Sequence, residues 1–275
     1  MWANHDWNNI FPFKRSANHS LLQSGRTPEP TFEAATEHMI RNYFGHPSYW
    51  RVDGGLYVSV YELMGLIQSL GGLEKAREVL DRFRKRTRDA DYGELRLNAV
   101  VWGIQNLPGE KILENPARMV DILGFDSVTS YVWVHNVPMD EYPTVEYANY
   151  AGKAIKDWYK FRDLYSVPYF PNVSMGWDSS PRTVQTDVHA DLGYPFTPIL
   201  VGNTPEAFHN ALQTAKSFLE EGYTEPPVLT INSWNEWTEG SYLEPDTVTG
   251  YQYLEGIRKV FGSSHIEHKE SDSQA

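Results

Sequence analysis

Two glutamates, Glu236 and Glu239, stand directly after an apolar run and have the residue type and spacing needed for paired acid and base chemistry. The run at 228–234 is rich in β-branched and aromatic residues, which predicts a buried strand. Carboxylates are costly to bury without partners, so a strand that ends in them breaks local preference, as functional sites commonly do. The alternative is a solvated loop with ordinary surface glutamates, but such a loop has no need of Trp234 and Trp237 around its acids.

The two carboxyl groups can meet only if the chain turns between them. Residues three apart lie on the same side of a helical turn but on opposite sides of a straight strand. Gly240 follows the pair and would allow a turn at Trp237 and Thr238. Glycoside cleavage uses two such carboxyl groups, one protonated and one ionised, held in different environments. The spacing leaves open whether the stereochemical outcome is retention or inversion.

The composition favours an uncharged, hydroxyl-rich partner. The 275 residues include 36 acidic and 24 basic ones, and the net charge of −12 opposes binding to nucleic acid and to anionic membranes. Aromatic residues make up 14% of the chain and include nine tryptophans, whose rings can stack on the apolar faces of sugars. We therefore expect an oligosaccharide or polysaccharide substrate, and neither nucleic acid nor a membrane as partner.

The chain has no cysteine, which excludes disulfides, thiolate zinc sites and cysteine nucleophiles. No apolar run approaches the roughly 20 residues that span a bilayer, and the first residues show no basic-then-apolar leader. A cytoplasmic location is the default expectation, with a truncated N-terminus left open.

Short apolar runs alternate with longer amphipathic ones, and these predict strands and helices respectively. The predicted strands are 56–61, 95–101, 127–132, 168–174 and 227–234, and the predicted helices are 31–43, 73–87, 116–123, 145–164, 204–221 and 250–261. Thr204 followed by Pro205 is a good helix start, and Gly222 is a suitable stop. Repeated βα alternation implies parallel strands joined by helical crossovers.

Polar and aromatic side chains collect just after the predicted strands, where (β/α)8 barrels build their active sites. The chain has no glycine-rich phosphate loop, which an open nucleotide-binding sheet would carry. We therefore predict an α/β fold of the (β/α)8 TIM-barrel type. Its substrate-binding candidates are Asn4, His5, Asp6, Trp7, Glu62, Tyr131, Trp133, Trp177, Asp178, Trp234, Asn235, Trp237 and Tyr242. The alternatives are a frayed terminus for residues 4–7, a salt-bridged structural role for Glu62 and core packing for Trp177.

The number of strands is too small for a closed barrel. Five strands are predicted inside the chain and residues 1–4 look like the tail of a sixth, so about two βα units are lacking. We expect a fragment that starts at an internal methionine, with one partial barrel domain over residues 1–262. The polar segment 263–275 has little to bury and is expected to be a disordered tail.

Two acidic patterns resemble metal-binding motifs. Asp187, His189 and Asp191 alternate like metal ligands, but no second cluster completes a coordination shell. Asp89 and Asp91 have the Asp-x-Asp spacing of metal-dependent glycosyltransferases, yet they precede a strand and so belong to the opposite face of the sheet. We expect a solvated loop at 187–191, no metal-binding role for Asp89 and Asp91, and neither a metal nor another cofactor.

The segment 234–240, Trp-Asn-Glu-Trp-Thr-Glu-Gly, together with 242–246, resembles the WbsX-like proteins, which are related to glycoside hydrolase family 99. Residues 2–7 are similar to the WANxxW element of those proteins, and 46–50 with 57–62 resemble their next strand region. The resemblance extends to about residue 261. It implies a (β/α)8 barrel that acts on glycans, with the first two βα units missing here.

The resemblance also implies roles for the two glutamates. Glu236 would be the base that deprotonates the 2-hydroxyl of the sugar to form an anhydro-sugar, and Glu239 the general acid and base at the glycosidic oxygen. Family 99 proteins usually carry histidine where this chain has Thr238. We predict a metal-independent, retaining-type glycoside hydrolase that cleaves an α-linked, mannose-like glycan. The alternatives are a glycosyltransferase of surface polysaccharide synthesis and a non-catalytic carbohydrate-binding barrel.

Overall fold

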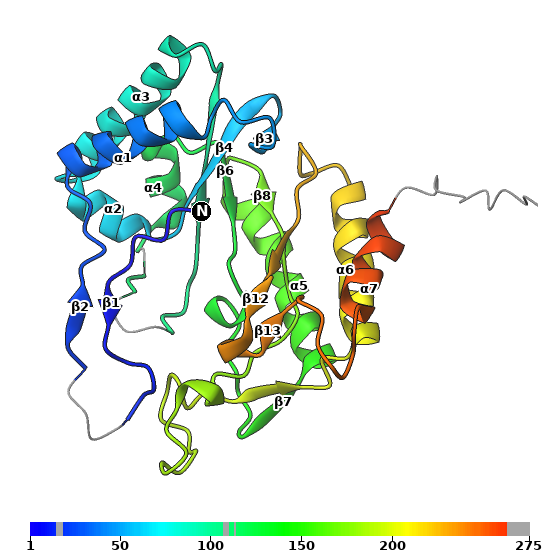
Figure 1. Ribbon diagram of the computed structural model, residues 1–275. Coiled ribbons are helices and arrows are strands. Elements are labelled where there is room, and N and C mark those ends of the chain that lie inside the picture. The colour runs from blue at the N-terminus through cyan, green and yellow to red at the C-terminus, as the bar shows by residue number, and fades with distance from the viewer. Residues whose placement is uncertain (15–18, 107–109, 113, 263–275) are drawn as a thin grey trace, which may run out of the picture.

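The computed structural model describes residues 1–14, 19–106, 110–112 and 114–262. Strands and helices alternate along it (Figure 1). The central sheet has the order β3 (Arg51–Val52), β4 (Gly55–Val60), β5 (Leu95–Val100), β6 (Ser127–Thr129) and β8 (Tyr169–Phe170). The short β3 is antiparallel to β4, and the other neighbours are parallel. The predicted parallel βα arrangement is confirmed for this sheet.

The parallel series continues on both sides of the central sheet. Beyond Pro171, β9 (Asn172–Ser174) pairs in parallel with β11 (Thr230–Asn232). At the opposite edge, Trp2 forms a parallel bridge to Val60 of β4. All five predicted internal strands are therefore present, with the first residues of the chain in the sixth position. Closure into an eight-stranded barrel is not seen within the described ranges and stays a prediction.

Buried side chains show that the series of strands is curled. Asn98 of β5 donates to Ser59 of β4 at 2.9 Å and accepts from Ser127 of β6 at 2.9 Å. The hydroxyls of Thr129 on β6 and Thr230 on β11 lie 3.2 Å apart, although the strand formed by β8 and β9 separates β6 from β11. Neighbouring strands lie about 4.8 Å apart, so side chains two strands apart can touch only across a strongly curved sheet.

The helices are α1 (Glu29–Asn42), α2 (Leu63–Ser69), α3 (Leu73–Asp89), α4 (Pro116–Leu123), α5 (Tyr147–Leu164), α6 (Pro205–Glu220) and α7 (Gln252–Phe261). Helices α1 to α4 lie on one side of the molecule and α5 to α7 on the other (Figure 1). All six predicted helices are confirmed to within two residues at both ends, and α2 was not predicted. In the described part of the chain no helix is long and apolar enough to cross a membrane.

Helical periodicity accounts for how the helices cover the sheet. Helix α3 buries Ala76, Val79, Leu80 and Phe83, which lie on one helical face. Full burial of a side chain the size of valine or phenylalanine contributes about 1.5–3 kcal/mol. The predicted start of α6 is confirmed, because the Thr204 hydroxyl accepts the backbone N–H of Ala207 at 3.2 Å.

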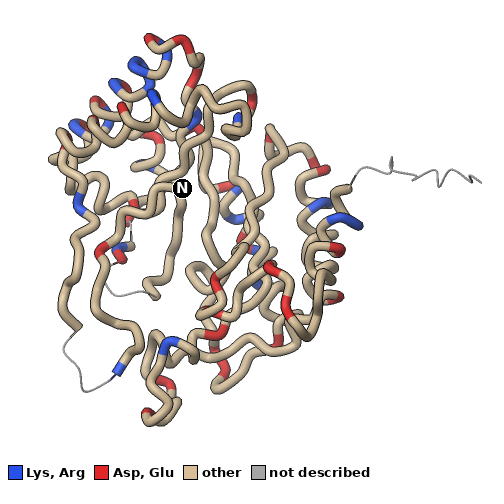
Figure 2. The backbone as a smooth tube through the Cα atoms, viewed as in Figure 1, with Lys and Arg blue, Asp and Glu red and all other residues tan. Residues whose placement is uncertain are grey.

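The charged face of α3 is turned to solvent, where red and blue positions alternate (Figure 2). Arg82 forms ion pairs with Glu29 and Glu33 of α1, and Lys85 pairs with Asp89. Asp89 ends α3 and therefore lies before β5, as predicted for the Asp-x-Asp pattern. This surface is remote from the C-terminal ends of the strands, where Glu236 and Glu239 lie.

Three small strand pairs were not predicted, and they are made of loop segments. They are β1 (Trp7–Asn8) with β2 (Leu21–Gln23), β7 (Thr144–Glu146) with β10 (Ile199–Val201), and β12 (Asn235–Glu236) with β13 (Ser241–Tyr242). The helix predicted from residue 145 is wrong at its start, because residues 145 and 146 belong to β7 and pair with β10. The predicted tail at 263–275 lies outside the described residues.

Candidate active site

The chain turns between the two glutamates, as predicted. Glu236 ends β12 and Glu239 ends the 3-10 turn η3 (Trp237–Glu239), after which β13 returns antiparallel to β12. Gly240 closes the turn with a φ of +60° in the left-handed region. A Cβ at this position would lie 2.8 Å from Cβ of Asp178, so the close approach also requires glycine.

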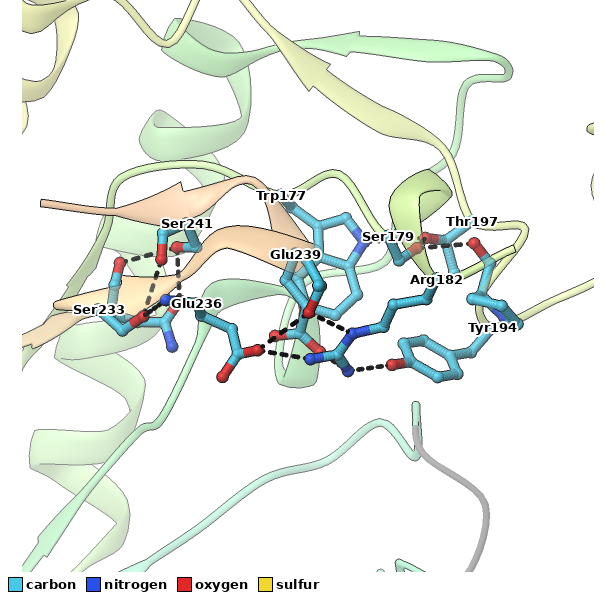
Figure 3. A network of polar contacts seen from close by, with 12 residues as sticks. Trp177, Ser179, Arg182, Tyr194, Thr197, Ser233, Glu236, Glu239 and Ser241 are labelled. Atoms are coloured by element: carbon cyan, nitrogen blue, oxygen red, sulfur yellow. Dashed lines mark hydrogen bonds and ion pairs between the residues drawn. The ribbon is translucent and has the colours of Figure 1, made fainter. Parts of the chain in front are cut away.

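Arg182 brings the two carboxyl groups together (Figure 3). It ends the 3-10 turn η2 (Ser180–Arg182), and its Nη2 lies 2.5 Å from Oε1 of Glu236 while its Nη1 lies 2.7 Å from Oε1 of Glu239. The arginine side chain is 12% exposed, so both ion pairs are largely shielded from water. A single guanidinium thus holds both glutamates, and their carboxyl groups converge.

The guanidinium itself is fixed on several sides. Its Nε donates to the Thr238 hydroxyl at 2.8 Å and its Nη1 donates to the Tyr194 hydroxyl. The Phe11 ring lies 4.6 Å from the guanidinium carbon in a cation–π contact. The planar fork of arginine can make all these contacts at once, whereas the compact ammonium of lysine could not.

The two glutamates lie in different environments. The Glu239 side chain is 6% exposed, and burial raises its pKa to about 7, although the neighbouring Arg182 cation acts in the opposite direction. The Glu236 side chain is 34% exposed and lies closer to solvent. Glu239 is therefore poised to give and take a proton near neutral pH.

Glu236 and Glu239 line a cavity of about 430 Å³, a size typical of small-molecule sites. One wall is made by the first residues of the chain and the other by segments after the strands. The lining residues are Met1, Ala3, His5, Asp6, Trp7, Asn8, Ile10, Phe11, Tyr61, Tyr131, Arg182, Glu236 and Glu239. The chain therefore brings together residues more than 230 positions apart in sequence.

Several predicted binding residues line this cavity together with the glutamates. His5, Asp6, Trp7 and Tyr131 do so. Asp6 is held in place because its Oδ1 accepts the Ser24 hydroxyl at 3.0 Å and a backbone N–H at 2.8 Å. His5 stacks on Trp7 with ring centres 5.1 Å apart, which gives this wall an aromatic surface.

Asn4 and Glu62 lie outside the cavity lining, contrary to expectation. The Asn4 amide donates to the Glu62 carbonyl at 2.6 Å and accepts the Glu62 backbone N–H at 2.9 Å. The Glu62 carboxylate accepts the backbone N–H groups of Met64 and Gly65 and so caps α2. The structure thus gives both residues a structural role, because their polar groups hold the N-terminal segment and the start of α2.

Trp133, Trp177 and Asp178 are also absent from the cavity lining. The Trp133 indole is buried and donates to the Asn172 carbonyl at 2.8 Å. The Trp177 indole is buried and donates to the Thr197 hydroxyl at 2.8 Å, so the core-packing alternative describes Trp177. Asp178 accepts the Ser180 backbone N–H at 2.9 Å and thereby supports the turn that carries Arg182.

The remaining predicted residues lie on the β12–β13 hairpin and are absent from the cavity lining. Trp234, Asn235 and Trp237 are exposed. Trp237 stacks on Tyr242 with ring centres 3.7 Å apart. These rings are accessible from solvent but do not contact the cavity lined by the glutamate pair.

Sequence reasoning missed Arg182, Tyr194, Phe11 and Tyr61. The first three lie in loops that have no periodic pattern, and no feature of the neighbouring sequence indicates a functional role for them. Tyr61 did carry a signal, since it ends the predicted strand 56–61, where barrel strands present side chains to the active site. Across the described residues, no group of three or more His, Asp or Glu is arranged to hold a metal ion.

A sequence model of the family described as Glycosyltransferase WbsX matches residues 1–257. The chain is also 26% identical over 268 residues to the uncharacterized protein WxcX in two strains of Xanthomonas campestris pv. campestris. That match covers 94% of this chain and 34% of WxcX, so the chain spans about a third of the length of these curated relatives.

One similar solved structure is the GH99 endo-α-mannosidase from Bacteroides thetaiotaomicron. The TM-score is 0.50 at 13% identity, and the match covers 86% of this chain and 61% of that one. At this identity the likeness concerns the fold, and it agrees with the curled series of parallel strands described above.

Proposed function

The chain belongs to the WbsX glycosyltransferase family, and we propose that it acts on glycans as a glycoside hydrolase through Glu236 and Glu239. The observation that carries the proposal is the pair of carboxyl groups on one arginine in a 430 Å³ cavity. One group is buried with a pKa of about 7 and the other is partly exposed. Glycosidases use two carboxyl groups in different environments, so that one is protonated and acts as the acid while the other is ionised and acts as the base or nucleophile.

In the first step, protonated Glu239 gives its proton to the glycosidic oxygen as the bond from that oxygen to C1 breaks. Ionised Glu236 takes the proton of the 2-hydroxyl, whose oxygen closes onto C1 to give a 1,2-anhydro-sugar. In the second step, Glu239 takes a proton from water as the water oxygen attacks C1, and Glu236 returns its proton to O2. One water is consumed, both glutamates are restored, and two inversions at C1 give net retention.

The neighbours of the pair suit these roles. Arg182 keeps a positive charge against the Glu236 carboxylate and fixes its direction. Thr238, which stands where family 99 proteins usually have histidine, has its hydroxyl 3.3 Å from Oε1 of Glu236. Trp7, Tyr61 and the other aromatic residues of the wall offer apolar faces for a sugar ring. We infer an α-linked, mannose-like glycan as the substrate class.

The proposal is tested with Glu239→Gln on an α-linked manno-oligosaccharide. Turnover falls by about 10²–10⁴-fold because the proton donor is lost, while the dissociation constant for the oligosaccharide changes only a few-fold. Glu255→Gln, an exposed position on α7, is the matched control and keeps wild-type turnover. Undiminished turnover in Glu239→Gln would end the proposal.

A glycosyltransferase is the second candidate, and the description of the family favours it. A transferase needs a site for the diphosphate of a sugar donor. In the described cavity, the guanidinium of Arg182 is already engaged by two carboxylates. Saturable binding of a nucleoside-diphosphate hexose, with no binding of the free oligosaccharide, would favour the transferase. Oligosaccharide binding without any turnover would favour a non-catalytic carbohydrate-binding barrel.

A further inference from the structure

Thr238 stands between the two glutamates in the chain and has no assigned role in the reaction proposed above. It is the middle residue of the turn η3 (Trp237–Glu239), and it is absent from the cavity lining. Its hydroxyl nevertheless bonds to two members of the candidate active site, Arg182 and Glu236. A threonine hydroxyl can accept one hydrogen bond and donate another at the same time, so it can connect a cation to a carboxylate.

The three groups form a closed set of hydrogen bonds. Nε of Arg182 donates to the Thr238 hydroxyl at 2.8 Å, and Nη2 of the same guanidinium donates to Oε1 of Glu236 at 2.5 Å. The Thr238 hydroxyl donates to this same Oε1 at 3.3 Å. Nε and Nη2 lie along one edge of the planar guanidinium, so that edge holds the hydroxyl and the carboxylate oxygen side by side. Nη1 bonds separately to Glu239 and Tyr194.

The two oxygens of the Glu236 carboxylate are therefore not equivalent. Oε1 accepts hydrogen bonds from both Arg182 and Thr238, whereas no residue in the described part of the chain donates to Oε2. The last side-chain torsion of a glutamate has a broad range, and two bonds to one oxygen restrict it. Because Glu236 lines the cavity, Oε2 is the oxygen that remains free to accept a proton from a bound sugar.

We propose that Thr238 is a positioning residue for the base: together with Arg182 it holds Oε1 of Glu236, so that Oε2 takes the proton of the 2-hydroxyl. As the bond from C1 to the glycosidic oxygen breaks, this proton passes to Oε2 and the electron pair left on O2 forms the new bond to C1. When water opens the anhydro-sugar, the proton returns from Oε2 to O2. Thr238 keeps its own proton throughout. This inference rests on the proposed function of Glu236 as the base.

Valine at position 238 tests the hydroxyl, because it keeps the β-branched shape of threonine and removes both hydrogen bonds. In Thr238→Val, kcat on an α-linked manno-oligosaccharide falls by about 10-fold, while the dissociation constant measured by calorimetry changes by less than about twofold. Thr238→Ser keeps the hydroxyl and retains kcat to within about threefold. Thr214→Val on α6 is the matched control with wild-type kcat, since the exposed Thr214 hydroxyl bonds to the Asn210 carbonyl of its own helix.

An unchanged kcat in Thr238→Val would overturn the proposal. An equal loss of kcat in Thr238→Ser and Thr238→Val would also overturn it, because the hydroxyl would then not be the group responsible. A merely structural role for Thr238 would weaken glycan binding together with kcat, so the division between kcat and the dissociation constant separates positioning from structure. Thr238→Ala replaces the valine variant if the latter does not fold.

A measurement that needs no turnover separates this proposal from the hydrolase. Urea unfolding of the wild type, Thr238→Val, Arg182→Met and the double variant forms a double-mutant cycle. The effect of Thr238→Val on the unfolding equilibrium constant is expected to be about threefold smaller once Arg182 is replaced, because the hydrogen bond to the hydroxyl is already lost. Additive effects would overturn the proposal at any level of turnover. Coupling in a wild-type chain that cleaves no glycan would overturn the hydrolase and leave the contact between Thr238 and Arg182 in place.

Discussion

At the scale of single residues, the two glutamates share Arg182 as a partner and differ in their exposure to solvent. Its guanidinium bonds to both carboxyl groups, but one of them is buried and the other partly exposed. Burial disfavours the charged form of Glu239, and the arginine only partly offsets that cost. The acid and the base are thus separated by solvent exposure, since their nearest charged partner is the same.

Arg182→Met is expected to raise the pKa of Glu239 above its value of about 7, because the cation that favours ionisation is gone. The same change removes the guanidinium that bonds to Glu236, so kcat/KM for the oligosaccharide falls by about 10²-fold or more. A carboxyl NMR titration and steady-state kinetics measure the two effects. Arg182→Lys is the control, since it keeps the charge and loses the two-pronged contact. A fall in the Glu239 midpoint in Arg182→Met would contradict the account.

Glu239 should also make stability depend on pH. Its pKa is about 7 when folded and has an ordinary value of 4.5, so the folded state binds the proton more tightly. This contribution to stability is fully present below pH 4.5 and is lost as the pH rises through about 7. A shift of this size corresponds to roughly 3 kcal/mol.

Urea unfolding of wild type and Glu239→Gln between pH 4 and pH 8 measures this dependence. The wild-type free energy of unfolding falls across the window relative to that of the variant, which cannot titrate at this position. Parallel curves for the two proteins would show that Glu239 is not held protonated by the fold.

At the scale of elements, the residue pattern predicted those helices and strands whose bounds are not changed by contacts with distant segments of the chain. Helix α3 and the strands β4 and β5 have strong periodicity, and their bounds agree closely with the sequence prediction. Helix α2 has only seven residues, and its start depends on the Glu62 cap, so periodicity could not reveal it. The start of α5 was missed because the pairing of β7 with β10 is a contact between distant segments.

The candidate site was predictable to a similar degree. The break between an apolar run and two glutamates located Glu236 and Glu239, and Gly240 indicated the turn between them. Arg182 lies in a long loop, and its contact with the pair depends on the path of that loop, which no local pattern encodes. The strand-end rule located residues 61 and 62 correctly but could not tell which of these two side chains faces the cavity.

Alanine substitution at Gly240, in the turn between the glutamates and β13, can be compared with the same substitution at Gly250. Gly240 and Gly250 have φ values of +60° and +59°, but an added Cβ meets Asp178 only at Gly240 and finds open space at Gly250. Gly250→Ala is expected to cost about 1–2 kcal/mol from the left-handed conformation alone. Gly240→Ala costs about 1–3 kcal/mol more because of the clash, and displaces Glu239. Chemical denaturation measures both, and equal losses would contradict the tight approach to Asp178.

At the scale of the whole molecule, the cavity depends on how the first residues of the chain are attached to the sheet. Trp2 donates to the Ser59 carbonyl at 2.7 Å and accepts the Tyr61 backbone N–H at 3.0 Å. Asn4 adds two hydrogen bonds to the backbone of Glu62. The segment that carries His5 to Trp7 is thereby fixed as the wall opposite the glutamate pair.

Asn4→Ala is expected to loosen this wall. The change leaves the buried N–H and carbonyl of Glu62 without their side-chain partner, which costs about 2–3 kcal/mol of stability. Because His5 and Trp7 then lose their fixed positions, the dissociation constant for the oligosaccharide should rise about 10-fold or more. Asn42→Ala is the control, since Asn42 is an exposed residue whose bonds are to its own helix. Urea unfolding and calorimetry separate the two effects: a stability loss with unchanged affinity would mean that the N-terminal wall does not contact the glycan.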